Sequence, residues 1–174
     1  MKEAIIIGAG RLGKGFIGET IANSPAWNMT FIDTDPVVIS NLREAGSDHV
    51  TVHRFDRIEE HSISNCEAYT WWQEAITDKI IQADLIMFVI YPEKISEAVI
   101  TLMDGLKVRK EKNPHQNLSI IFLTNKNHMM QGIHEQFSHM LTDTDHIWFN
   151  NHVVLRDSII RRSTDAESNQ SLNI

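Results

Sequence analysis

Five glycines fall within the fourteen residues from Ile5 to Gly18, and the first of them follows a short apolar run. Three form the pattern G-x-G-x-x-G between a predicted strand and a predicted amphipathic helix. In that setting the first glycine permits a tight turn, the second leaves room for a pyrophosphate, and the third lets the helix pack closely on the strand. Free N–H groups at the start of the helix also favour phosphate binding. The predicted contact residues are Gly8, Gly10, Arg11, Leu12 and Gly13.

A carboxylate stands where a dinucleotide site needs one. Asp33 closes the segment MTFID, twenty positions after Gly13, where its side chain can accept hydrogen bonds from the ribose of the adenosine. Thr34 and Asp35 follow, and no Arg stands close by to bind a 2′-phosphate. The sequence therefore predicts NAD rather than NADP as the cofactor. The alternative is that the glycines form only a turn and that Asp33 only caps a helix.

Apolar runs alternate with helical patterns along the chain, which is typical of a parallel α/β sheet. The runs are continuously apolar, as expected for strands that are covered on both faces. The predicted strands are Ala4–Ile7, Met29–Ile32, Val50–Phe55, Leu85–Ile90, Ser119–Leu123 and Ile147–Phe149. The predicted helices are Leu12–Ala22, Pro36–Glu44, Trp72–Ile81, Lys94–Lys110 and Met129–Met140. The predicted fold class is α/β, a Rossmann-type, doubly wound, mainly parallel sheet with helices on both faces, and the nucleotide crevice is expected at the carboxyl ends of the first and fourth strands.

Two stretches need a separate interpretation. Asp35 and Pro36 suit the start of a helix, because Asp can cap the first turn and Pro is tolerated within it. The segment 56–69 is polar and irregular, and we interpret it as a hairpin or an excursion rather than a linker. Trp71 and Trp72 are expected to pack at the strand-to-helix junction that follows rather than to stack on a base, since aromatic side chains are usually in the core.

Composition limits the class of protein and its partners. The 174 residues suit one domain, or one domain plus the start of another, and an apolar fraction of 42% is that of a soluble globular protein. The formal charge of −7 argues against nucleic acid as a partner, because a surface that binds phosphates usually needs clustered Lys and Arg. Cys66 is the single cysteine, and neither a secretory start nor a membrane-spanning apolar stretch is visible. We therefore expect a cytoplasmic protein without membrane contact.

The chain resembles a known family, the polyol-specific long-chain dehydrogenases. The resemblance rests on the order and spacing of GAGRLGKGFIG, TFID, ADLIMFVIYP, GLKVRKEKNPHQNLSIIFLTN and VLRDSIIRR, and it covers nearly the whole chain. Gly15 and Gly18 belong to it, because GxGFIG after the third motif glycine is more specific than the dinucleotide pattern alone.

The resemblance implies a function for the complete protein. Members of the family transfer a hydride between nicotinamide and a secondary alcohol of a polyol or sugar phosphate, such as mannitol 1-phosphate, and a lysine of a following helical domain is the general base. On this basis residues 1–163 are an NAD-binding domain and residues 164–174 begin the linker to a helical domain that this chain does not contain. No catalytic residue is assigned here, and the chain alone is expected to be inactive. A dinucleotide-binding module without dehydrogenase activity, a sensor or an interaction protein, is the alternative.

Several positions depart from the family pattern at the expected cofactor site. Arg11 replaces a usual Asn, and its side chain can contact a phosphate or reach solvent. Tyr91 stands where Gly commonly precedes Pro92, so that a bulky ring replaces exposed backbone beside the cofactor. We include Tyr91 and Pro92 among the predicted cofactor-binding residues.

Two further departures lie near the expected nicotinamide end. The asparagine of the family's EN-Met segment corresponds to Asn125 when the preceding strand is matched, or to His128 when the following helix is matched, and we prefer Asn125. Arg161 replaces the second acid of a segment that begins at Asp157, which leaves open whether the substrate is mannitol 1-phosphate, a free polyol or a hexuronate.

No metal site is predicted. His134 and His139 resemble the histidines of a zinc-binding helix, but a spacing of five residues does not place them on one face. They are expected on a solvated helical surface.

Overall fold

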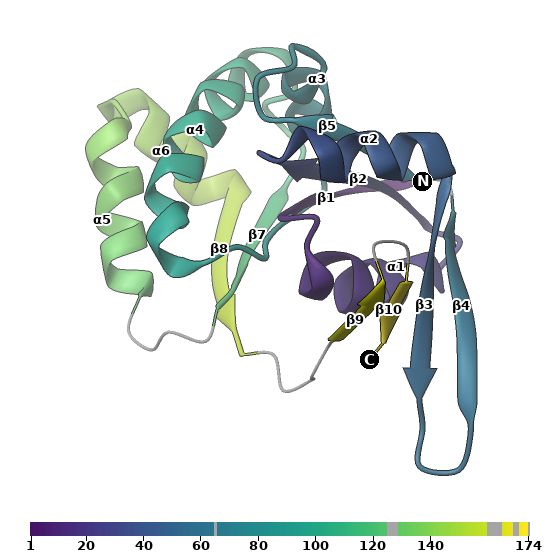
Figure 1. Ribbon diagram of the computed structural model, residues 1–174. Helices are drawn as coiled ribbons and strands as arrows, with labels where there is room; N and C mark the ends of the chain where they lie inside the picture. Colours follow the sequence, from purple (N-terminus) through teal and green to yellow (C-terminus); the bar gives the residue numbers. More distant parts are fainter. Residues whose placement is uncertain (65, 125–128, 160–164, 169–170, 174) are drawn as a thin grey trace.

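The computed structural model describes residues 1–64, 66–124, 129–159, 165–168 and 171–173, and its centre is a six-stranded sheet (Figure 1). The strand order is β5-β2-β1-β6-β7-β8, and all five pairings are parallel. The strands are β1 (Lys2–Ile7), β2 (Trp27–Asp33), β5 (Cys66–Thr70), β6 (Leu85–Phe88), β7 (Leu118–Leu123) and β8 (Val153–Ser158). The chain starts in the middle of the sheet with β1, continues to the edge strand β5, and then returns to build the other half from β6 to β8. This order confirms the predicted doubly wound fold.

Helices cover both faces of this sheet, as predicted. Ile17, Ile39 and Leu42 pack on one face with Phe31 of β2. On the other face, a second core contains residues of the four later α-helices together with alternate residues of the same strands. The helical segments are η1 (Gly13–Gly18), α1 (Glu19–Ala22), α2 (Pro36–Ala45), α3 (Ala75–Gln82), η2 (Pro92–Lys94), α4 (Ile95–Lys112), α5 (Met130–Met140) and α6 (Asp143–His152). In the described ranges, none of the helices has the length and apolar character needed to cross a membrane.

The expected start of α2 is confirmed. Asp35 caps the helix, because its Oδ1 accepts the backbone N–H of Val37 at 2.8 Å, and Pro36 occupies the first turn. The helix ends at Ala45, and Gly46, which follows it, has a left-handed φ of 61°.

The excursion after α2 forms a second sheet. β3 (Ser47–His53) and β4 (Ile58–Ser64) are an antiparallel hairpin that extends beyond the rest of the molecule (Figure 1), and β3 also pairs with β10 (Ser171–Asn173), which pairs with β9 (Asp165–Ser168). The hairpin interpretation of the segment 56–69 is confirmed only for β4, because the partner strand β3 precedes that segment, and the assignment of Val50–Phe55 to the main sheet is wrong. The third strand on that side of the sheet is instead β5, most of which lies in the segment 56–69 that was interpreted as a hairpin or an excursion.

The hairpin is attached to the first helical segment. Ile63 of β4 is fully buried beside Gly18, and the carboxylate of Glu19, which is 5% exposed, lies 2.6 Å from Nδ1 of His61. A buried carboxylate is costly unless it is paired, so these contacts fix the base of the hairpin on α1.

The predicted strand Ile147–Phe149 is also wrong, because these residues lie in α6. Thr142 and Asp145 form a capping box that starts this helix, which then buries Trp148 and leaves Ile147 exposed. The sixth strand of the sheet is β8, directly after α6.

The start of α6 is joined to α4 by an ion pair that makes stability depend on pH. Nζ of Lys110 lies 2.6 Å from Oδ1 of Asp145, and this contact, with the hydroxyl of Thr142, lowers the pKa of Asp145 to about 2. Because the carboxyl is more acidic when folded than when unfolded, the pair stabilises the protein above the unfolded pKa of roughly 3.9 and loses this effect as the pH falls toward 2.

Lys110→Met is expected to raise the pKa of Asp145. The free energy of unfolding should then decrease less in this variant than in the unaltered protein when the pH falls from about 6 to about 2.5. Carbon-detected NMR titration of the carboxyl and urea unfolding at the two pH values measure these effects. Lys112→Met, an exposed change in the same helical turn, is the control and should leave both unchanged. An unaltered Asp145 titration in Lys110→Met would contradict the pairing.

Candidate dinucleotide site

The glycine-rich loop lies between the carboxyl ends of β2 and β6. Ile7, the last residue of β1, pairs with Ile32 on one side and with Phe88 on the other. The N–H of Gly8 donates to the carbonyl of Ile32 at 2.8 Å, and the N–H of Val89 donates to that of Ile7 at 2.7 Å. This is the point where the strand order reverses, at which doubly wound sheets bind nucleotides.

Each motif glycine has the surroundings that its predicted role requires. Gly8 has a φ of 105°, and a Cβ there would lie 2.4 Å from the carbonyl oxygen of Val89. A Cβ on Gly13 would lie 1.8 Å from the carbonyl oxygen of Gly8. Gly10 is exposed, and a Cβ there would meet nothing within 4 Å. The first and third glycines therefore allow close packing, and the second leaves open space above the loop.

Asp33 is bonded to the same loop. Its Oδ2 accepts the backbone N–H of Ala9 at 2.7 Å, and its Oδ1 accepts the N–H of Asp35 at 3.0 Å. The side chain is half-buried at the end of β2. A carboxylate offers about four lone-pair positions, so two bonds leave acceptor capacity for ribose hydroxyls. The contact with Ala9 was not predicted from the sequence, because no pattern identifies a backbone donor.

Arg11 and Leu12 lie in the first helical turn after the loop. The N–H of Lys14 donates to the carbonyl of Gly10 at 2.9 Å and closes this turn. Arg11 is exposed and Leu12 is half-buried. Their contact with a cofactor stays a prediction.

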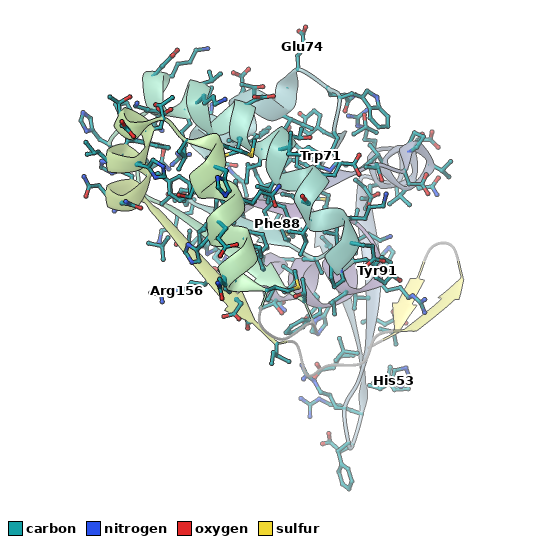
Figure 2. All side chains as sticks on the ribbon, turned by 90° about the vertical axis from the view of Figure 1, so that its left-hand side faces the viewer. His53, Trp71, Glu74, Phe88, Tyr91 and Arg156 are labelled. Atoms are coloured by element: carbon teal, nitrogen blue, oxygen red, sulfur yellow. The ribbon has the colours of Figure 1, made fainter. Side chains whose placement is uncertain are left out.

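Tyr91 and Pro92 follow β6 on the other side of the loop. Tyr91 is 76% exposed, and its carbonyl accepts the N–H of Lys94 in the short helix η2 that Pro92 begins. Figure 2 shows Phe88 inside the molecule and Tyr91 nearer its edge. A large exposed ring therefore lies two residues after Val89, whose backbone contacts the glycine-rich loop, and the role of this ring stays a prediction.

The far part of this sheet edge is formed by β7 and β8. Thr124 is buried after β7, and exposed Asp157 lies opposite Phe122 in the register of the two strands. Asn125, its alternative His128, and Arg161 lie outside the described residues. Within the described ranges, no three His, Cys, Asp or Glu side chains gather closely enough to hold a metal ion.

Trp71 and Trp72 differ in their burial. Trp71 is half-buried against the core, as expected for a junction residue, but Trp72 is 66% exposed, so the packing predicted for it is wrong. The strand before them, β5, is the feature that would have indicated their position. Thr70 ends β5 directly opposite Asp33, which places the two tryptophans at the edge that carries the site.

The glycine contacts predict effects of very different size for the same substitution at two positions. Gly13→Ala is expected to lower the free energy of unfolding by roughly 3 kcal/mol or more, because the added methyl overlaps the carbonyl of Gly8. Gly10→Ala is the matched control and should change stability by less than about 1 kcal/mol. Urea unfolding measures both. If the Gly13→Ala protein were as stable as the Gly10→Ala protein, the helix could move away from β1 without lowering the free energy of unfolding, which would contradict the prediction.

Comparisons with known proteins agree with this geometry. The family model described as mannitol dehydrogenase Rossmann domain matches residues 2–173. A mannitol-1-phosphate 5-dehydrogenase of Lacticaseibacillus paracasei is 32% identical over 127 residues, which are 72% of this chain and 33% of the relative. Another, of Lactococcus lactis subsp. lactis, is 25% identical over 177 residues, which cover 99% of this chain and 45% of the relative. The chain thus spans less than half the length of these relatives.

A structure of octopine dehydrogenase with NADH and L-arginine superposes with a TM-score of 0.73 at 10% identity, over all of this chain and 39% of that one. At this identity the likeness concerns the fold alone. The family match, the fold and the glycine-rich loop agree, and the chain belongs to the mannitol dehydrogenase Rossmann-domain family.

Proposed function

We propose that this chain binds NAD(H) and is the cofactor-binding part of an oxidoreductase that acts on a polyol or a sugar phosphate. The observation that carries the proposal is the Asp33 carboxylate, bonded to Ala9 of the glycine-rich loop at the switch point of the sheet. The relatives that share the family are named mannitol-1-phosphate 5-dehydrogenases, which supports mannitol 1-phosphate as the substrate. A free polyol or a hexuronate remains the alternative substrate.

The residues of the site fit a dinucleotide. The open space at Gly10 admits a pyrophosphate next to backbone N–H groups, and the remaining lone pairs of Asp33 accept ribose hydroxyls. Bound NAD supplies the carbon that accepts the hydride. Asp157 lies at the part of the sheet edge where the nicotinamide is expected. The resemblance assigns Asn125 to the same end of the cofactor.

Asp33 is expected to select NAD(H) over NADP(H). A 2′-phosphate would meet the carboxylates of Asp33 and Asp35, so NADH should bind at least about tenfold more tightly than NADPH. Titration calorimetry with both cofactors measures the ratio. Asp33→Asn should weaken NADH binding more than NADPH binding, whereas Asp104→Asn, an exposed change in α4, should alter neither. Equal or tighter binding of NADPH by the unaltered chain would show that Asp33 does not bind the ribose.

We further infer that the chain alone binds the cofactor without turnover. The relatives extend over more than twice the matched length, and the resemblance places the catalytic lysine in a following helical domain. Loss of a positioned general base costs about 100- to 10,000-fold in rate, and loss of substrate orientation lowers the rate further.

Assays with NAD and mannitol 1-phosphate, mannitol, sorbitol 6-phosphate or hexuronates should therefore give no NADH above the blank. Sustained NADH production that Gly10→Trp abolishes would contradict this inference and would identify the 174 residues as a sufficient enzyme.

A dinucleotide-binding module without dehydrogenase activity is the second candidate. It is favoured by Tyr91, a 76% exposed ring where the family commonly has Gly. The coding sequence after residue 174 distinguishes the two candidates, because a helix bearing Lys, Asn and His would favour the enzyme. Since Cys66 is the single cysteine, we place either activity in the reducing cytoplasm.

A further inference from the structure

Trp72 is a large exposed aromatic side chain at the same sheet edge as Asp33. It is 66% exposed, whereas its neighbour Trp71 packs against the core. We propose that the indole of Trp72 is the platform on which the adenine base of the cofactor stacks. This inference rests on the proposed cofactor function and assigns a residue to the base, which neither the glycine motif nor Asp33 does.

The register of the sheet places Trp72 on the adenosine side. β2 and β5 are parallel neighbours, and Asp33 lies directly opposite Thr70. Neighbouring strands are about 4.8 Å apart, so Trp72, two residues beyond Thr70, starts close to the carboxylate that is expected to bind the ribose. Adenine is bonded directly to that ribose and must lie within reach of the same edge. Val37, in the first turn of α2, adds a second exposed apolar side chain there.

Tyr91 is the other exposed ring near the loop, but it lies farther from Asp33 in the strand order. It follows β6, which is separated from β2 by β1, whereas Trp72 follows β5, the direct neighbour of β2. Figure 2 shows Tyr91 well separated from Trp71, the residue before Trp72. The base attached to a ribose at Asp33 therefore meets Trp72 and not Tyr91.

The turn that carries Trp72 is held in place. Oε1 of Gln73 accepts the N–H of Thr70 at 3.0 Å and Nη2 of Arg43 at 2.7 Å. Nε of the same Arg43 donates to the carbonyl of Ala68 at 2.7 Å, which joins α2 to β5. The exposed ring thus stands on a turn fixed to both elements that border the adenosine side. Such preorganisation reduces the entropy lost when a ligand binds.

The test separates the base from the rest of the cofactor. Stacking of a base on an aromatic ring is sensitive to alanine substitution, so Trp72→Ala should weaken binding of NADH and of ADP-ribose about 5- to 100-fold. Nicotinamide mononucleotide has no adenine, and its binding should not change. Trp72→Phe keeps an aromatic face and should retain most of the affinity. Titration calorimetry of each ligand gives these values, and circular dichroism confirms the fold of each variant.

Trp27→Phe is the control. Trp27 lies at the amino end of β2, whereas Asp33 lies at its carboxyl end, so this change should not alter ADP-ribose binding. If the unaltered chain binds neither NADH nor ADP-ribose, the proposed function fails and this inference fails with it. If it binds both and Trp72→Ala binds them equally well, only this inference is overturned. Unchanged affinity together with a dimer that Trp72→Ala dissociates would assign the ring to contact between copies of the chain and would also overturn it.

Discussion

The geometry of the site depends on the contact between Gly13 and the carbonyl of Gly8. A Cβ on Gly13 would lie 1.8 Å from that oxygen, so the first helix and the end of β1 meet through backbone alone. This contact keeps the loop between them short and leaves Gly10 exposed above it. It also brings the N–H of Ala9 to the carboxylate of Asp33, 24 residues later in the chain. A packing constraint between two glycines thereby positions the groups that are proposed to bind pyrophosphate and ribose.

The same helical segment packs on a second element through Gly18. A Cβ there would lie 2.9 Å from the ring of Phe31 and 3.0 Å from Ile63, a residue of the hairpin. Glu19, the next residue, contacts His61 of the same strand. The glycine pattern thus has two functions that the dinucleotide motif does not separate. Gly13 allows the approach to β1, and Gly18 allows the approach of the hairpin, which gives a physical reason for the longer glycine pattern of the family.

The sequence predicted the central strands and missed the two edge strands, β5 and β8. Central strands of a parallel sheet are covered on both faces and form continuous apolar runs, as β1 and β7 do. β5 has five residues with alternating burial, and β8 ends in exposed polar residues, so neither forms such a run. The apolar run Ile147–Phe149 was assigned in place of β8, although the capping box at Thr142 begins a helix there. For the candidate site, the close packing at Gly8 and Gly13 and the open space at Gly10 were predicted, because they follow from backbone sterics at fixed spacing. Contact of these glycines with a cofactor stays a prediction.

The missed strand β5 explains why Trp72 was assigned to packing. Without the pairing of that strand with β2, the two tryptophans are only aromatic residues at a junction before a helix, and core packing is the ordinary expectation. With it, Thr70 lies opposite Asp33, and the exposed indole belongs to the edge that binds the ribose in our proposal. Short motifs identify the phosphate and ribose positions because these need particular backbone and carboxylate groups. The base needs only an apolar surface, so its binding residues are found through the pairing of strands that are distant in the sequence.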